Sequence, residues 1–234
     1  MKGNAFRLVI KMNDLSLYLK KLPFYDHLTD GEKALIISNW SQRNYKKGQL
    51  IYSRSDECLG HVLMCSGTVR CYINSKEGRE ITLFCLSPDD TCVLSAACAI
   101  TRLPFDTQMS AVSDASLLVI NSGVFKRLAE QNVHVKCYMY ELLTNHFSYA
   151  MGAMQQIIFM GYDKRLAVFL LSELEKSENR EIKMTHEQIA QYTNSAREVV
   201  ARMLKRFSSD GIVEYRRGVV TVKNEGALKI LAKS

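Results

Sequence analysis

The sequence predicts an α+β fold with an N-terminal antiparallel β-roll, a long dimerisation helix and a C-terminal winged helix-turn-helix. Three observations predict it. Short β-rich segments with turn residues between them fill residues 45–120, apolar residues recur at heptad spacing over residues 140–161, and two short helical segments precede a hairpin over residues 185–224. We therefore expect three domains, at residues 1–133, 134–161 and 162–234.

The first part begins with a helix and continues as strands. TDGEKALIISNW predicts a helix capped by Thr29 or Asp30. In NSKEGRE, Gly78 can take positive φ at the tip of a hairpin. The strand segments are rich in Val, Ile, Tyr and Thr. They are QLIYSR, HVLMCSG, TVRCYINS, REITLFCLS and ASLLVIN.

A long helical stretch is predicted to begin near Val124. Within it, apolar residues alternate at spacings of three and four, which is the pattern of a heptad seam. This seam predicts a two-fold dimer helix, with an intramolecular core helix as the alternative. Gly161 interrupts the helix, and Asp163 is expected to cap the next one, DKRLAVFLLSEL. The seam residues are Tyr140, Leu143, Phe147, Ala150, Met154 and Ile157.

The last 70 residues or so have the pattern of a winged helix-turn-helix. MTHEQIAQYT predicts a short helix with Thr185 as N-cap and Gln188 completing a capping box. In the following turn, Asn194 occupies the position at which the backbone is expected to adopt the left-handed conformation. GIVEYRRGVVTVKN then reads as a hairpin with Gly218 at its tip.

The helix after the turn has two different faces. Its apolar residues follow the i, i+3, i+4, i+7 pattern of a buried stripe, at Val200, Met203, Leu204 and Phe207. The other face carries Arg197, Glu198, Ala201, Arg202 and Lys205. A solvated face with a Glu198–Arg202 pair worth roughly 0.2–0.5 kcal/mol is one interpretation. Contact with a partner is the other, and the small Ala201 would allow a close approach.

The composition is that of an ordinary globular protein with a basic balance. Of 234 residues, 47% are hydrophobic and 24% charged, the net charge is +7 and the pI is about 9.0. Residues 163–234 hold 14 basic against 10 acidic residues, which suits a polyanionic partner. No run approaches the roughly 18 apolar residues of a membrane span, and the N-terminus lacks the features of a signal peptide. We expect a cytoplasmic protein without membrane contact.

The cysteines do not predict a metal site or a disulfide framework. Their number is odd and no C-x-x-C occurs. Several stand in apolar alternating segments, where a reduced Cys behaves as a small hydrophobic residue. The seven are Cys58, Cys65, Cys71, Cys85, Cys92, Cys98 and Cys137.

The C-terminal segment IAQYTNSAREVVARMLKRFSSDGIV resembles the signature I-[AG]-x-x-x-G-x-S-R-E-x-V-x-R-x-L of the CRP/FNR superfamily of transcription regulators. KKGQLIY and CSGTVRCY resemble the β-roll of that family, and the resemblance spans residues 20–230. It implies a homodimeric, sequence-specific DNA-binding regulator with an effector-sensing β-roll and an inverted-repeat operator. RNA polymerase and a small-molecule effector are further candidate partners, and no enzymatic activity is expected.

The resemblance places Arg197, Glu198 and Arg202 at the positions that read base edges. Arg can donate two hydrogen bonds to guanine and Glu can accept one from cytosine, so the chemistry agrees. Two departures concern the start of the helix: Asn194 replaces the turn glycine, and Ala196 replaces the usual Ser. Ser195 or Thr193 is then expected to contact phosphate instead. The expected backbone contacts are Thr185, Thr193, Ser195, Lys205, Arg216 and Arg217.

The sensor half departs further from the family. Relatives that bind cyclic AMP carry a Gly-Glu pair and an Arg-Ser pair. A buried phosphate without a paired arginine is costly, so we expect an unidentified signal other than a cyclic nucleotide. Relatives of the FNR type hold an iron–sulfur cluster on N-terminal cysteines, and no Cys precedes Cys58 here. The tentative effector-pocket residues are Val93, Leu94 and Ser95 at the Gly-Glu site, Asp106 and Thr107 at the Arg-Ser site, and Arg102.

The identity of any cofactor stays open at this point. His61, His134 and His146 leave haem as a candidate. Cys92 and Cys98 flank VLSAA in the pocket segment and are expected to be packing residues beside a small apolar or zwitterionic ligand. The alternative function is a ligand- or redox-sensing protein whose winged helix binds protein rather than DNA, because a winged helix can do either.

Overall fold

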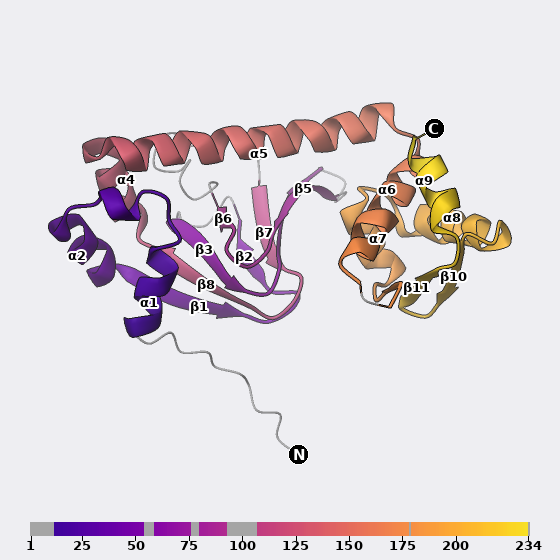
Figure 1. Ribbon diagram of the computed structural model, residues 1–234, viewed down its shortest axis with the longest axis horizontal. Helices are drawn as coiled ribbons and strands as arrows, with labels where there is room; N and C mark the ends of the chain where they lie inside the picture. Colours follow the sequence, from indigo (N-terminus) through magenta and orange to yellow (C-terminus); the bar gives the residue numbers. More distant parts are fainter. Residues whose placement is uncertain (1–11, 54–58, 76–79, 93–106, 178, 234) are drawn as a thin grey trace, which may run out of the picture. The chain divides into compact units, whose positions relative to one another are not determined.

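The computed structural model describes residues 12–53, 59–75, 80–92, 107–177 and 179–233. The chain divides into two compact units. The first comprises residues 1–77 and 83–150, and the second residues 78–82 and 151–234. Figure 1 shows the elements of both units and labels most of them.

The first unit contains two four-stranded sheets that form a β-roll (Figure 1). One sheet has the order β1-β8-β3-β6, with β1 at Trp40–Tyr45, β8 at Ala115–Ile120, β3 at His61–Ser66 and β6 at Thr91–Cys92. The other has the order β2-β7-β4-β5, with β2 at Leu50–Tyr52, β7 at Thr107–Ala111, β4 at Val69–Asn74 and β5 at Glu80–Leu86.

Strand β8 is buried on both faces because two separate cores flank it. Successive side chains of a strand point to opposite faces. Leu117 and Val119 accordingly belong to the core inside the roll, whereas Leu118 and Ile120 belong to a core that the helices cover. This explains why the segment ASLLVIN has consecutive apolar residues rather than alternating apolar and polar ones.

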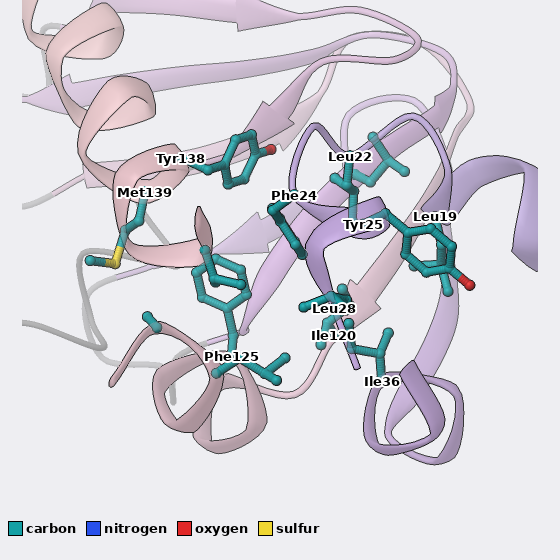
Figure 2. Packing of buried hydrophobic residues seen from close by; sticks show 14 of the residues in the cluster. Leu19, Leu22, Phe24, Tyr25, Leu28, Ile36, Ile120, Phe125, Tyr138 and Met139 are labelled. Carbon is teal, nitrogen blue, oxygen red and sulfur yellow. The ribbon is translucent and has the colours of Figure 1, made fainter. Parts of the chain in front are cut away.

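The second of these cores lies between the roll and the helices of the first unit. Phe24 is its aromatic centre, with the ring of Tyr138 at 5.0 Å and that of Phe125 at 6.3 Å between centroids. Figure 2 shows these rings with the aliphatic side chains around them. The surrounding helices are α1 (Met12–Leu19), the 3-10 helix η1 (Tyr25–His27), α2 (Asp30–Ser38), α4 (Ser122–Gln131) and the start of α5 (Val133–Phe159).

The helix predicted over residues 29–40 is shorter than expected. Thr29 is its N-cap and forms a capping box with Glu32, so Asp30 is the first helical residue. The helix ends at Ser38, and the extension to Trp40 is wrong. Trp40 instead begins β1 and pairs with Ile120 of β8, because strand pairing outweighs the weak local helical preference there.

The long helical stretch is two helices rather than one. It begins at Ser122, not Val124, with Asn121 as N-cap, and it is interrupted at Asn132 before α5 starts at Val133. The cap predicted for the following helix is also wrong. Gly161 is the N-cap of α6 (Tyr162–Glu175), and within the described residues the Asp163 carboxylate accepts only from the N–H of Lys164.

The second unit has one core of its own, built from residues 162–232. Its elements after α6 are β9 (Glu181–Ile182), α7 (His186–Tyr192), α8 (Arg197–Ser209), β10 (Val213–Arg216), β11 (Val219–Val222) and α9 (Glu225–Lys233). The strands form an antiparallel sheet in the order β10-β11-β9. This is the predicted winged helix-turn-helix.

Four strands are not among those that the sequence predicts: β1, β6, β7 and β9. Two of them are two residues long, and β7 reads TQMSA, in which polar residues alternate with small or apolar ones. Such segments become strands because neighbouring strands supply hydrogen-bond partners. Within the described residues, no helix is both long and apolar enough to cross a bilayer.

Candidate nucleic-acid interface

The turn between α7 and α8 is held by local hydrogen bonds. The Thr185 hydroxyl accepts from the N–H of Gln188, and the Gln188 side chain accepts from the N–H of Thr185, so the predicted capping box is present. Asn194 has φ 51°, the left-handed conformation predicted for it. The N–H of Ser195 then donates to the carbonyl of Ala190 at 3.0 Å. These bonds fix the direction in which α8 leaves the turn.

The apolar stripe of α8 anchors it in the core of the second unit. Val200, Leu204 and Phe207 are fully buried, and Met203 packs against the same core. Because the stripe occupies one side of the helix, the other side is presented to solvent. The N-cap residue Ala196 makes no side-chain hydrogen bond to the first turn, so the positive end of this helix stays open to an anion.

The exposed face of α8 carries the predicted base-reading residues. Arg197, Glu198 and Arg202 are all exposed, as is Lys205. Within the residues that the structure describes, none of these four has an ion-pair partner. The Glu198–Arg202 pair of the solvated-face interpretation is therefore not formed. These side chains remain available to a partner.

The structure places the Thr193 side chain in the protein interior, and its phosphate contact stays a prediction. Thr193 is buried, and its hydroxyl donates to the carbonyl of Ile189 at 2.7 Å and lies 3.2 Å from the hydroxyl of Tyr162. Burial raises the pKa of Tyr162, and its hydrogen bond with Thr193 opposes part of this rise. Ser195 stays half-buried at the start of α8. Tyr162 was not expected from the sequence, because only the fold brings α6 to this turn.

The hairpin of β10 and β11 carries a second group of positive charges. Gly218, at φ 79°, makes its tight turn. Arg216 is exposed but donates to the carboxylate of Glu214 at 3.0 Å, and Lys223 contacts the same carboxylate at 2.8 Å. Hydrogen bonds from Lys223 and Arg216 hold the pKa of Glu214 below its usual value. Arg217 is exposed and has no ion-pair partner within the described part of the chain.

Most of the tentative effector pocket cannot be placed. Val93, Leu94, Ser95, Arg102 and Asp106 lie outside the described residues, as does Cys98.

Two predicted residues of this segment are described, and both are buried. Thr107 begins β7 opposite Ile73. Cys92 is fully buried in β6, which agrees with a packing role for its thiol.

The three histidines considered for haem have different surroundings. His61 is fully buried with its ring stacked on Phe125 at 4.5 Å. His134 stacks on His27 at 3.9 Å, and His146 Nδ1 lies 2.8 Å from the carbonyl of Leu142. Among the described residues, no group of three His, Cys, Asp or Glu side chains could hold a metal ion.

Helix α5 exposes an apolar face. The side chains of Tyr140, Phe147 and Met154, seven residues apart, are 51%, 66% and 49% exposed. Met151 and Ile158 on the same side are also exposed. Leu143 is partly buried against the core of the first unit. The predicted seam thus contains a strip of large apolar side chains that the single chain leaves uncovered.

Comparisons with known proteins cover both units. Residues 164–231 match the family described as the Crp-like helix-turn-helix domain. Residues 42–132 match the cyclic nucleotide-binding domain. The first match contains the whole of α7, α8 and the hairpin, and the second contains the strands of the roll from β2 to β8.

Whole-chain relatives have the same order of parts. A solved structure from Eubacterium rectale, assigned to the CRP/FNR family of transcriptional regulators, is 37% identical, with a TM-score of 0.86. The match covers 92% of this chain and 100% of that one. The cyclic AMP receptor protein of Thermus thermophilus is 24% identical, over 92% of this chain and 98% of its own length. FixK2 from Bradyrhizobium japonicum has the same fold, with a TM-score of 0.66 at 21% identity over 82% of this chain and 96% of that one.

Proposed function

Because the chain belongs to the CRP/FNR family of DNA-binding transcription regulators, we propose that it acts as a homodimer that reads an inverted-repeat operator. The observation that carries this proposal is the exposed face of α8, where Arg197, Glu198 and Arg202 have no ion-pair partner in the described part of the chain. Such side chains can each reach a base edge in the major groove. Half-sites of a two-fold dimer are then about one helical turn apart, ~34 Å.

The apolar strip of α5 is the proposed dimer contact. Large apolar side chains at seven-residue spacing pack in pairs when two helices run side by side. A second copy of the chain supplies the same strip, so a dimer with a two-fold axis buries the strips of both copies against each other. The proposed seam keeps the predicted residues and adds Met151 and Ile158, because both are exposed on this side.

The proposed signal acts at the β-roll and is not a cyclic nucleotide. The Thermus thermophilus relative is a cyclic AMP receptor protein, but Asp106 and Thr107 stand here where a cyclic-phosphate site needs an Arg-Ser pair. Thr107 is buried in β7, and an unpaired buried phosphate is unfavourable. Titration of the purified chain with cyclic AMP by calorimetry should give no binding heat.

The experiment that tests the function is operator selection followed by a salt titration. DNA sequences bound from a random pool should converge on an inverted repeat. Affinity for it should fall roughly 10³- to 10⁵-fold between 50 and 200 mM salt if some 6–10 phosphates are contacted. A chain that selects no sequence, and instead binds a protein through its winged helix with little salt dependence, would support the alternative function.

A further inference from the structure

Three sulfur-containing side chains from three different strands share the core inside the β-roll. Cys71 of β4 and Met109 of β7 stand directly opposite each other in the strand register. Cys92 of β6 belongs to the other sheet. All three side chains are in the core inside the roll and are at most 1% exposed. DNA binding uses none of them.

The contacts between the three side chains run through neighbouring strands and across the sheets. Cys92 Sγ lies 3.9 Å from Met109 Sδ. Cys71 is the register partner of Met109 in the adjacent strand. Cys92 therefore contacts Met109 across the space between the sheets, and Cys71 stands beside Met109 in the same core. Packing accounts for any one buried thiol, but this arrangement also has the composition of a ligand set.

We propose that Cys71, Cys92 and Met109 form a three-coordinate binding site for the soft monovalent ion Cu(I) inside the β-roll. Thiolate and thioether ligands select Cu(I) over harder ions. With metal–sulfur bonds of ~2.3 Å, three ligands in a plane would place their sulfur atoms ~4.0 Å apart. The observed separation of 3.9 Å between Cys92 and Met109 meets this requirement for one of the three sulfur pairs.

The protons and charges of this binding step balance. The two thiol S–H bonds break, two copper–thiolate bonds form, and two protons pass to solvent. Met109 donates a sulfur lone pair, and no atom changes oxidation state. The loaded site carries one net negative charge. Burial raises the pKa of the Cys71 thiol well above its ordinary value, and the charge of Arg70, also buried in β4, opposes part of this rise.

Two other uses of the trio fit the geometry less well. Stacked sheets stand about 10 Å apart, whereas a disulfide joins Cα atoms at about 4.4–6.8 Å. A bridging ion spans the gap between Cys71 and Cys92 with less movement. Zinc prefers four ligands of the Cys, His or carboxylate type. Met109 is a poor zinc ligand, and the described residues bring no third ligand of that type to the two thiols.

The direct test is an anaerobic Cu(I) titration against a colorimetric Cu(I) chelator. A full-length variant that keeps only Cys71 and Cys92, with serine at Cys58, Cys65, Cys85, Cys98 and Cys137, should bind one Cu(I). X-ray absorption should show three sulfur neighbours at ~2.3 Å. Release of two protons should make the affinity rise about 100-fold per pH unit while both thiols are protonated in the free protein.

Three single variants locate the site. In the two-cysteine background, Cys71→Ala and Cys92→Ala should each abolish stoichiometric binding. Met109→Leu nearly conserves side-chain volume, so the fold should survive while the number of sulfur neighbours falls from three to two. Cys137→Ser in the wild type is the matched control, because Cys137 is an exposed cysteine of α5, and it should leave this site unchanged.

Fluorescence of the single tryptophan, Trp40, reports that each variant is folded. A folded two-cysteine variant that binds no Cu(I), or equal binding after Cys71→Ala, would overturn the site. Tight stoichiometric zinc binding with no preference for Cu(I) would do the same.

A role for this ion as the signal rests on the proposed function. Operator affinity measured with and without one equivalent of Cu(I) should differ in the wild type and be equal in Cys71→Ala. Equal affinity in a wild type that has bound copper would overturn the signalling role and leave the metal site standing. Absence of operator binding in every state would instead overturn the proposed function, because the metal titration involves no DNA.

Discussion

Arg197 and Glu198 occupy the first turn of α8, and Arg202 follows one turn later. Their positions come from the buried stripe of Val200 and Leu204, which leaves this face of the helix in solvent. An unpaired charged side chain on a helix anchored in this way keeps its hydrogen-bonding capacity for a partner. In the proposed complex these side chains would confer specificity, since each base contact discriminates against the wrong base.

Separate Arg197→Ala, Glu198→Ala and Arg202→Ala substitutions should each relax the preference at one operator position. The expected loss of discrimination is roughly 1–3 kcal/mol, measured as affinities for operators changed one base pair at a time. Lys205→Ala is the comparison, because a phosphate contact should weaken binding to all sequences alike. If all four variants weaken binding uniformly, the three residues do not read bases.

His61 is the most unusual titratable residue of the first unit. Its ring is stacked on Phe125, and neither ring nitrogen has a hydrogen-bond partner among the residues that the structure describes. Burial lowers the pKa of His61 from its ordinary 6.5 to about 3. The folded protein therefore holds the neutral imidazole, while the unfolded chain takes up a proton below pH 6.5. Stability is fully present above pH 6.5 and is lost as the pH falls toward 3.

Between pH 7 and pH 5, protonation of unfolded His61 should lower the free energy of unfolding by about 2 kcal/mol. His61→Leu should remove this pH dependence and should be nearly as stable as the wild type at pH 7, because it leaves no unpaired polar atom. Urea unfolding followed by Trp40 fluorescence measures both. Trp40 packs against the same core as Phe125.

Two comparisons isolate His61 in that experiment. Burial also lowers the pKa of His146, so the difference between wild type and His61→Leu is the relevant quantity. His186→Leu, in the second unit, should leave the Trp40 transition unchanged at both pH values. An identical pH dependence in the wild type and His61→Leu would contradict the assignment.

At the scale of elements, α5 combines a buried face with an exposed apolar one. Val135, Tyr138 and Met139 are buried against the first unit, whereas Phe147 and Met154 are about half exposed or more. The sequence shows the same heptad pattern for a core helix and a dimer helix. A core helix would bury these apolar side chains within one chain, whereas a dimer helix would leave them exposed in one chain. The exposure of Phe147 and Met154 therefore favours the dimer helix at these two positions.

Phe147→Glu combined with Met154→Glu should convert the proposed dimer to monomers. Two buried charges per helix facing their symmetry mates are costly to desolvate. Light scattering at micromolar concentration gives the mass. Leu143 is avoided because it also packs against the core of the first unit. Tyr149→Glu, about 160° around the helix from Phe147, should remain dimeric. A wild type that is monomeric under these conditions would exclude the seam.

The hairpin of β10 and β11 is the wing of the winged helix-turn-helix, and its two arginines differ in their surroundings. Arg217 has no ion-pair partner in the described part of the chain, whereas Arg216 is held by Glu214. Arg217→Ala should lower the slope of log affinity against log salt by about 1–2 per dimer, and Arg216→Ala should lower it less. Sequence preference should persist in both variants. A slope equal to that of Lys33→Ala, a control in α2, would mean that the wing does not touch DNA.

At the scale of the molecule, the two units have separate cores. Every residue of the second unit's core lies between Tyr162 and Ala232. A fragment of residues 161–234 should therefore fold alone, with a cooperative thermal transition in circular dichroism. Such a small core gives modest stability. A fragment without a cooperative transition would show that its fold depends on the rest of the chain.

Most of the fold was predictable where a pattern is local. The capping boxes of Thr29 and Thr185, the left-handed Asn194 and the stripe of α8 each depend on residues within a few positions of one another. Strands β1 and β7 were missed, since their local preferences are weak and distant strands supply their partners. The N-cap of α6 was assigned to Asp163 instead of Gly161, because Gly161 makes no side-chain cap hydrogen bond.

The sequence by itself determined the family, the order of the parts and the charged face of α8, because hydrophobic period, capping residues and charge are properties of short segments. Only the tertiary structure decided that Thr193 is buried in contact with Tyr162, that His61 has no polar partner among the described residues, and that the sulfur atoms of Cys92 and Met109 meet in the roll. These facts depend on contacts between residues far apart in the chain. Sequence spacing does not determine such contacts, because strand register and sheet packing bring the residues together.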